Sequence, residues 1–192
     1  MQNNFYAMLS RMKYIDRWAL MRNTRKENLC EHSFEVAYIV HALAVIAEKR
    51  LGKKIDAGRA VLAALYHDTT EIITGDMPTP VKYYNPVIKT AYKEVESAAA
   101  DMLISNLPED IQAEYSALIR GIDGEIATLV KAADKISALI KCTEELKMGN
   151  REFTEAKAST ERAIKALNCP EADIFVKEFI PAYTLTLDEQ SK

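Results

Sequence analysis

Glycine, proline and cysteine are all scarce in this sequence. The 192 residues include six glycines, six prolines and three cysteines. Cys30, Cys142 and Cys169 form no CxxC pair and are odd in number, which argues against a disulfide framework and favours a reducing compartment. The N-terminal residues contain no apolar segment typical of a signal peptide. We therefore expect a cytoplasmic protein.

Long apolar runs and a strong net charge are also missing. The longest apolar run, residues 36–47, is too short to span a bilayer and contains a histidine. The net charge of −3 gives no indication of a nucleic-acid partner. The hydrophobic fraction of 48% and the charged fraction of 28% are ordinary for globular proteins. The composition predicts a globular protein that binds neither a membrane nor nucleic acid.

The hydrophobic pattern favours helices throughout. No segment alternates with period two for long enough to predict a strand, whereas apolar residues recur at helical spacing along most of the chain. We expect one all-α domain over residues 1–192, a helical bundle around central buried helices. The expected helices cover residues 5–12, 32–49, 57–73, 86–106, 109–120, 123–147, 151–167 and 171–182, with an ordered loop at 17–31 and a turn-rich loop at 74–81.

The segment YHDTTEIITGD, residues 66–76, carries an imidazole and carboxylates at the end of an apolar run. His67 and Asp68 are adjacent. Glu71 follows them by four and three residues, so it shares their side of the expected helix. Adjacent helix residues point about 100° apart, so His67 and Asp68 need a special reason to converge on one ligand. The segment is a candidate site.

Two further residues complete a possible metal site. His32 opens the preceding long helix, and Asp134 lies in the apolar stretch LVKAADKISALI. A buried histidine is more often a hydrogen-bonded core residue, and Asp134 could be satisfied by Lys131 or Lys135 on its own helix. Taken together with residues 67 and 68, however, two histidines and two aspartates from three helices would form an N/O site for a divalent transition metal between the central helices.

This pattern resembles a known family. His32, the pair His67-Asp68, and Asp134 resemble the metal-binding signature of the HD-domain phosphohydrolase superfamily. The blocks RWALMRNTRKENLCEHS, LYHDTTEIITGDMPTPVKY and LVKAADKISALIKCTEEL are similar to those of the bacterial HD-domain 5'-deoxynucleotidases. The resemblance implies a metal-dependent enzyme that hydrolyses deoxyribonucleoside 5'-monophosphates to deoxyribonucleosides and phosphate, by attack of a metal-activated water. It also implies a homodimer.

The resemblance gives roles to the metal site. His32, His67, Asp68 and Asp134 would bind one divalent ion, such as cobalt, manganese or another transition metal. Glu71 would act as a general acid or base, or would orient His67 or a water by a hydrogen bond. A second, histidine-rich metal site is not expected. The third histidine, His41, lies nine residues after His32, roughly 900° round a helix and thus on the opposite face. We expect His41 to be an interior or interface residue.

Substrate contacts are also implied by resemblance. Arg17 would orient the phosphate, in a catalytic as well as a binding role. Trp18, the sole tryptophan, would pack against the sugar and disfavour a 2'-hydroxyl, although a sole tryptophan is often a core anchor. The loop after Gly75 would line the nucleotide pocket, although it could also be only a rigid connection between helices. The expected substrate-contacting residues are Arg17, Trp18, His32, Asp68, Asp76, Met77, Pro78, Thr79 and Asp134.

Two other functions remain open at this stage. An HD phosphohydrolase could act on nucleoside triphosphates or other phosphomonoesters. A helical domain could also keep the metal site only for structure and serve as a metal-binding or interaction module. A change of Glu71 to glutamine would leave the behaviour of such a non-catalytic module intact.

Overall fold

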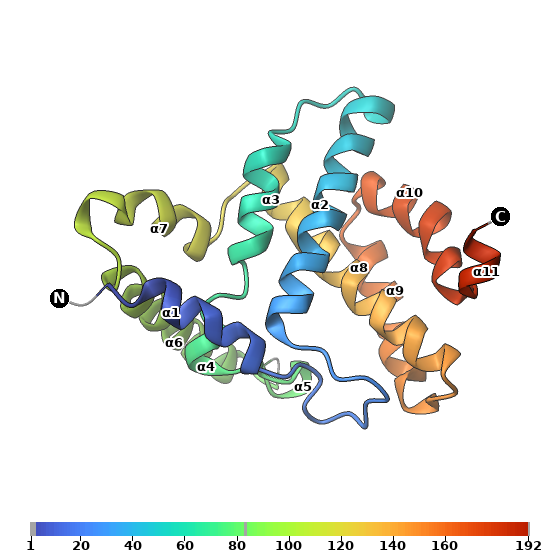
Figure 1. Cartoon of the computed structure of the whole chain (residues 1–192), viewed down its shortest axis with the longest axis horizontal. Coiled ribbons are helices and arrows are strands. Elements are labelled where there is room, and N and C mark those ends of the chain that lie inside the picture. The colour runs from blue at the N-terminus through green and yellow to red at the C-terminus, as the bar shows by residue number, and fades with distance from the viewer. Residues whose placement is uncertain (1–2, 83, 192) are drawn as a thin grey trace.

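Two helices of 23 residues, α2 (Leu29–Leu51) and α8 (Glu125–Lys147), lie at the centre of the computed structural model (Figure 1). The structure describes residues 3–82 and 84–191, except for the side chain of Thr79. The other α-helices are α1 (Phe5–Leu9), α3 (Ala57–Tyr66), α4 (Glu71–Thr74), α5 (Thr79–Lys82), α6 (Pro86–Ser105), α7 (Gln112–Arg120), α9 (Thr154–Ala166), α10 (Pro170–Phe179) and α11 (Leu187–Gln190). Short 3-10 helices are η1 (Ser10–Tyr14), η2 (Glu109–Ile111), η3 (Arg151–Phe153) and η4 (Ile180–Thr184).

The fold is all-α, as the sequence predicts. Within the described ranges there is no strand, only an isolated antiparallel bridge between Asp16 and Asn28. Several expected helices are shorter, because their ends tighten into 3-10 turns: η1 follows α1, η2 precedes α7, η3 precedes α9 and η4 follows α10. The expected loop at 74–81 already contains the start of α5, and α11 was not expected at all. Such shifts at element ends come from local capping, which periodicity does not detect.

Helix α2 starts three residues earlier than its apolar pattern indicates. The Asn28 side chain accepts hydrogen bonds from the backbone of Cys30 and Glu31, and the Glu31 side chain accepts from the Asn28 backbone N–H, which completes a capping box. The helix ends at Gly52, whose φ of 66° suits the left-handed C-cap that glycine adopts readily. Because the capping box starts α2 at Leu29, His32 lies in the first turn of this central helix.

The helices pack around two apolar cores, a larger and a smaller one. The larger core packs α2 against α3, α8, α9 and α10, around buried side chains such as Val40, Leu43 and Ile136. The smaller core joins α1, α6 and α7 around Phe5 and Leu103. In Figure 1 α2, α3 and α8 form the middle, with α1, α6 and α7 on one side and α9 to α11 on the other. Helices α2 and α8, which carry His32 and Asp134, therefore belong to the larger core.

The apolar length of α2 has a structural explanation. By length and composition alone α2 could cross a membrane, and 56% of its most apolar window is buried inside the structure. Its buried face packs on α3 and α8, as expected of a core helix. His41 lies on α2 but is exposed, so it is not an interior residue, and its place at an interface stays a prediction. His32 on the same helix is fully buried, which confirms that the two histidines occupy different faces.

Candidate metal centre and its surroundings

The helix expected over residues 57–73 is interrupted, and the interruption builds the site. Helix α3 ends at Tyr66, residues 67–70 form a turn, and α4 begins at Glu71. The His67 Nδ1 atom lies 2.7 Å from the Ala64 carbonyl oxygen. In an uninterrupted helix that carbonyl would accept the N–H of Asp68. The expected continuous helix was therefore wrong, and the turn removes the 100° separation that would have kept His67 and Asp68 apart.

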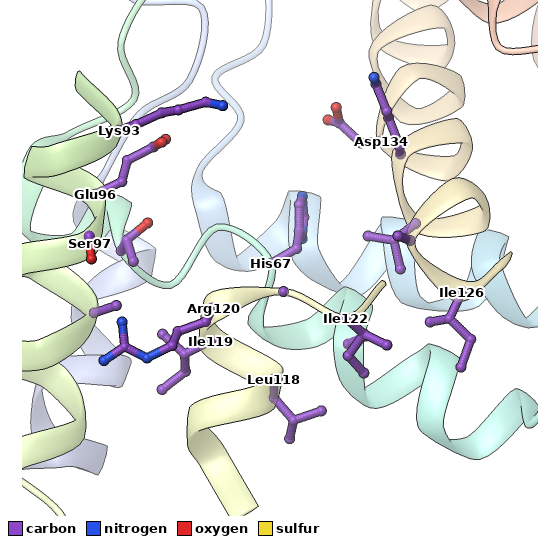
Figure 2. A pocket seen from close by; sticks show the side chains of 17 residues that line it. His67, Lys93, Glu96, Ser97, Leu118, Ile119, Arg120, Ile122, Ile126 and Asp134 are labelled. Atoms are coloured by element: carbon purple, nitrogen blue, oxygen red, sulfur yellow. The ribbon is translucent and has the colours of Figure 1, made fainter. Parts of the chain in front are cut away.

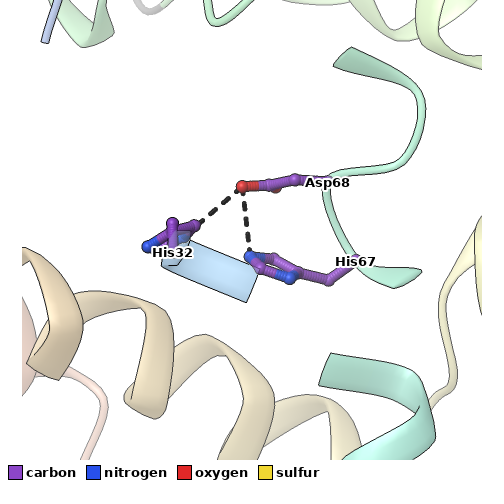
Figure 3. Close-up of side chains that lie close together, drawn as sticks. All are labelled: His32, His67 and Asp68. Carbon is purple, nitrogen blue, oxygen red and sulfur yellow. Dashed lines mark ion pairs between the residues drawn. The ribbon is translucent and has the colours of Figure 1, made fainter. Parts of the chain in front are cut away.

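The side chains of His32, His67 and Asp68 converge on one point (Figure 3). One ligand atom from each lies within 4.8 Å of the other two. The Asp68 Oδ2 atom is 3.4 Å from His32 Nε2 and 3.2 Å from His67 Nε2. His32 comes from α2, while the other two come from the turn after α3. Three of the four predicted metal ligands are thus brought together.

Both Nε2 atoms are buried and unpaired. Although carboxylate oxygens lie nearby, neither His32 Nε2 nor His67 Nε2 makes a geometrically acceptable hydrogen bond. A buried nitrogen without a partner is costly. Two imidazole nitrogens and a carboxylate oxygen facing a common point are the donor set of a divalent transition-metal site. The residues present therefore fit a divalent cation.

Hydrogen bonds at the opposite ring nitrogens orient both imidazoles. The Ala64 carbonyl can only accept, so His67 Nδ1 carries the proton and donates. His32 Nδ1 lies 2.9 Å from Ser137 Oγ, and Ser137 Oγ donates over 2.6 Å to Glu35 Oε2. The serine proton is thereby used, so Ser137 accepts from His32 Nδ1–H. In the neutral rings, both Nε2 lone pairs then face the cluster, as metal binding requires.

The fourth predicted ligand, Asp134, stands beside the cluster on α8. Its Oδ1 atom is 3.3 Å from His32 Nε2, and its Oδ2 atom accepts a hydrogen bond of 3.0 Å from Lys135. Asp134 therefore lies beside the predicted centre and also contacts its alternative partner, a lysine of the same helix. Burial raises the pKa of Asp134, but the close contact with His32 and the Lys135 charge outweigh burial and lower it. Asp134 is ionised and available to a cation.

The protonation of the cluster reflects its carboxylates. Burial lowers the pKa of His67, but the negative charges of Asp68 and Asp134 outweigh burial and raise it to about 9. Burial raises the pKa of Asp68, but His67 and His32 bring it well below its usual range. Without a cation, a proton thus occupies the place where positive charge is needed.

Glu71 is the acid–base candidate and is buried on α4, 8% exposed. Burial and the charges of Asp68 and Asp76 raise the pKa of Glu71 to about 9. Its Oε2 atom is buried without a hydrogen-bond partner. A carboxyl group with a strongly raised pKa beside a candidate metal site is typical of a catalytic acid or base.

The loop before α2 brings Arg17 and Trp18 to the centre. Arg17 Nη1 lies 3.2 Å from Asp68 Oδ2, and Glu27 Oε2 accepts hydrogen bonds from Arg17 Nε, at 3.3 Å, and from Trp18 Nε1, at 2.9 Å. The Trp18 backbone N–H donates to Asp76 Oδ2 over 3.2 Å. Trp18 has a φ of 59°, a left-handed conformation that is unfavourable for a bulky side chain. Strain of this kind persists where the surroundings enforce it.

A buried glutamate of α8 fixes the rest of this loop. Glu145 is 1% exposed and accepts hydrogen bonds from the backbone and hydroxyl of Thr24 and from the backbone of Arg25. Lys141 and Asn150 also donate to it. Burial raises the pKa of Glu145, but these donors lower it well below the usual range. The expected ordered loop is confirmed for residues 17–28, where Glu145 holds Thr24 and Arg25, whereas residues 29–31 belong to α2.

The other expected substrate contacts lie around this loop. Trp18 is half-buried and its ring lies 5.4 Å from that of Phe153, so it is both anchored and partly open. Met77 and Pro78 are half-buried between α4 and α5. The side chain of Thr79 lies outside the described part of the structure. The structure therefore joins Asp76 to Trp18, and it leaves the roles of the other loop residues as predictions.

A cavity of about 500 Å³ opens onto the cluster from the side of α6 and α7. Figure 2 shows Lys93, Glu96 and Ser97 of α6 on one wall, Asp134 on the facing wall and His67 between them. None of the predicted loop contacts lines it. Its lining residues are Ala63, His67, Thr70, Lys93, Glu96, Ser97, Ala100, Leu118, Ile119, Arg120, Gly121, Ile122, Ile126, Ala127, Val130, Lys131 and Asp134. The α6 wall of this cavity was not predicted from the sequence, because Lys93, Glu96 and Ser97 resemble the solvent-exposed face of a helix.

Solved structures share this architecture. An HD-domain phosphohydrolase from Listeria innocua matches with a TM-score of 0.84 at 24% identity, over 98% of this chain and 92% of that one. A cyanophage S-2L HD phosphohydrolase, solved with dA and one catalytic Zn²⁺ ion, matches with a TM-score of 0.65 at 19% identity, over 91% of this chain and 95% of that one. The chain therefore has the fold of the HD-domain class.

Sequence comparison identifies the family within this class. The 5'-deoxynucleotidase YfbR-like family model matches residues 4–183, and the chain belongs to this family. A 5'-deoxynucleotidase from Yersinia pestis is 46% identical over 191 residues, which cover 98% of this chain and 97% of the relative. The resemblance inferred from the sequence blocks is confirmed.

Proposed function

We propose that this chain is a metal-dependent 5'-deoxynucleotidase, which hydrolyses deoxyribonucleoside 5'-monophosphates to deoxyribonucleosides and inorganic phosphate. The observation that carries the proposal is the pair of buried, unpaired Nε2 atoms of His32 and His67, which face the Asp68 carboxylate. Membership in the family and the 46% identity to a 5'-deoxynucleotidase support the choice of substrate.

The proposed cofactor is one divalent cation held by His32, His67 and Asp68, with Asp134 beside them. When bound, such an ion supplies a Lewis acid that lowers the pKa of water and neutralises phosphate charge. The N/O donor set suits cobalt, manganese or another transition metal. His41 is exposed on a different face of α2 from His32, so it takes no part in this centre.

Arg17 and Glu71 have complementary proposed roles. Arg17 Nε and Nη1 contact Glu27 and Asp68, and among the described contacts its Nη2 group is left to donate to a phosphate oxygen. Glu71, whose pKa is raised to about 9, carries a proton at neutral pH in the absence of a cation. As water forms the new bond to phosphorus and the bond to O5' breaks, Glu71 can exchange a proton with the attacking water or the leaving oxygen.

The sugar and base would contact the loop that holds Trp18. We propose that Trp18 forms a wall against the deoxyribose and that Asp76, Met77, Pro78 and Thr79 contribute to the same side. Asp76 already fixes the Trp18 backbone, so the wall is rigid. A 2'-hydroxyl against such a wall would lose its hydrogen bonds to water without replacement, which disfavours ribonucleotides.

The phosphate has an electrostatic approach to the centre. Lys93 on α6 and Lys131 on α8 line the cavity that opens onto His67 and Asp134. Cations at the mouth of a cleft raise the local concentration of an anionic substrate. We propose that these lysines attract the substrate without taking part in the chemistry.

The proposed assembly and location follow from family resemblance and composition. We propose a homodimer in the cytoplasm that has no nucleic-acid or membrane partner. Sedimentation equilibrium at several protein concentrations would measure the oligomeric state, and a monomer throughout the range would overturn this part of the proposal.

The decisive experiment is phosphate release from matched dAMP and AMP. Metal-stripped protein would receive cobalt, manganese, magnesium or zinc in turn, with His67→Ala/Asp68→Ala protein as the control. We expect metal-dependent release from dAMP well above that from AMP, and no release by the control. Equal release from dAMP and AMP would still support phosphatase activity but would reject the proposed role of Trp18. No release by folded, metal-loaded protein would reject the proposed function.

A further inference from the structure

A chain of hydrogen bonds runs outward from the metal centre between α2 and α8. His32 and Ser137 are both 0% exposed, and His32 Nδ1 lies 2.9 Å from Ser137 Oγ. Ser137 Oγ lies 2.6 Å from Glu35 Oε2, and the other oxygen of Glu35 accepts a hydrogen bond of 2.8 Å from the Tyr38 hydroxyl. The sequence analysis did not identify Ser137 or Glu35.

Glu35 decides the direction of this chain. An ionised carboxylate can only accept, so the Ser137 hydroxyl must donate to it and must accept from His32 Nδ1–H. If the hydroxyl instead donated to Nδ1, the neutral imidazole would carry its proton on Nε2, the atom that faces Asp68, and that nitrogen could not bind a cation. The backbone carbonyl that orients His67 needs no such device, because a carbonyl has no proton to donate.

The orientation of Ser137 is not the default for a serine inside a helix. Buried Ser and Thr hydroxyls in helices commonly donate to a carbonyl of the preceding turn. Thr143, also buried on α8, does this with Leu139 at 2.8 Å. Ser137 instead contacts two side chains of α2. The hydroxyl therefore serves the contact to His32 rather than its own helix.

We propose that Ser137 and Glu35 are positioning residues for His32, which hold its ring in the tautomer and orientation that present Nε2 to a cation. They would thereby set the affinity of the centre for metal. The inference rests on the proposed metal centre, but it does not depend on which phosphate ester is hydrolysed. Partners of this kind around metal-binding histidines typically change metal affinity by about 10–100-fold when they are removed.

The test measures metal affinity directly. Metal-free wild type, Ser137→Ala, Glu35→Gln and the double variant would be titrated with Co²⁺ against a chromophoric chelator, and the visible absorption of bound Co²⁺ would be recorded. Thr143→Ala is the matched control, since it removes a buried hydroxyl from the same helix without touching the centre. Thermal unfolding of each metal-free variant would show that it is folded.

We expect Ser137→Ala to weaken Co²⁺ binding about 10–100-fold and to change the Co²⁺ spectrum. Glu35→Gln should weaken binding less, and the double variant should be no worse than Ser137→Ala, because the two residues act in series. Thr143→Ala should bind Co²⁺ as wild type does. If Ser137→Ala does not fold, Glu35→Gln decides the matter, since Glu35 is only half-buried.

Two results would overturn the inference. The first is a folded Ser137→Ala, or in its place Glu35→Gln, that binds Co²⁺ within twofold of wild type with the same spectrum. If wild type still releases phosphate from dAMP in that case, the proposed function stands and only the positioning role fails. The second is a wild type that binds no cation, which would reject both.

Discussion

Arg17 and Asp68 are separated by 51 residues in sequence, yet the guanidinium Nη1 lies 3.2 Å from the carboxylate Oδ2. This contact joins the irregular loop before α2 to a candidate metal ligand after α3. The same carboxylate oxygen faces the Nε2 atoms of His32 and His67. The proposed phosphate-binding residue therefore contacts an oxygen atom that also belongs to the proposed metal centre. A substitution at Arg17 or at Asp68 should affect the other residue.

Replacing Arg17 with lysine should separate charge from geometry. Lysine keeps the positive charge but cannot contact Glu27, Asp68 and a phosphate together through a planar fork. A hydrogen bond to a charged group contributes about 1.5–3 kcal/mol, so kcat/KM for dAMP should fall roughly 10–100-fold. Arg22→Lys is the control, because that side chain is 92% exposed on the same loop. Equal kinetics for the two variants would contradict the role of Arg17.

Replacing Glu71 with glutamine should separate catalysis from metal binding. Glutamine resembles the protonated carboxyl in shape, so the variant should fold and bind Co²⁺ with nearly unchanged affinity. It cannot exchange a proton, and kcat should fall by about 10²–10⁴-fold. Steady-state phosphate release and chelator titration would measure the two effects. A fully active variant would mean that Glu71 only orients its neighbours.

Metal affinity should rise with pH because a proton competes at His67. The pKa of His67 is raised to about 9 in the folded, metal-free protein, above its ordinary 6.5. Its stabilisation of that form is therefore complete below pH 6.5 and is lost as the pH rises through 9. Binding of a cation releases this proton, so the apparent affinity should increase by up to about tenfold per pH unit between these values.

Chelator titrations at pH 6.5, 7.5 and 8.5 would measure this dependence. Thermal unfolding should show the same linkage, with the metal-free protein losing stability over the interval and the stabilisation by metal growing. Glu71→Gln serves as a control, since the pKa of Glu71 is also raised to about 9 and its protonation contributes in the same direction. An affinity that does not change with pH in this variant would exclude His67 as the competing base.

Removing the charged lysine side chains that line the cavity should slow the capture of substrate but not the chemical step. For Lys93→Ala and Lys131→Ala we expect KM for dAMP to rise a few-fold at low salt while kcat is unchanged. The effect should shrink as salt screens the charges. Lys165→Ala, an exposed lysine on α9, is the control. A loss of kcat in the Lys93 or Lys131 variant would instead place that lysine in the chemistry.

The helices of this fold were largely predictable, and the break that matters most was not. Apolar periodicity identified the central helices because their burial dictates it. The turn at residues 67–70 escaped prediction, because AVLAALYHDTTEII continues the helical pattern without glycine or proline. In this turn the His67 side chain contacts the Ala64 carbonyl. Competition between a side chain and the backbone is decided by three-dimensional packing.

The candidate site shows the same division. The grouping of His32, His67 and Asp68 was predictable because their order in the chain, with Asp134, resembles the metal-binding signature of the HD-domain superfamily. Ser137 and Glu35 were not, since a serine inside an apolar helix and a glutamate near a helix start are ordinary residues. Only the hydrogen bonds that lead from His32 to Ser137 and from Ser137 to Glu35 single them out. Residues that orient a ligand leave a weaker sequence signal than the ligand itself.

Helix α8 carries both Asp134, beside the metal cluster, and Glu145, which fixes the loop before α2. The two positions are separated by three helical turns, roughly 16 Å along a stiff rod. Because the helix is regular and rigid, it fixes the distance between the cluster and the point where Glu145 holds the loop before α2. Loop flexibility does not set this distance. Anyone transplanting this loop into another helical phosphohydrolase would need to transfer the register of α8 with it.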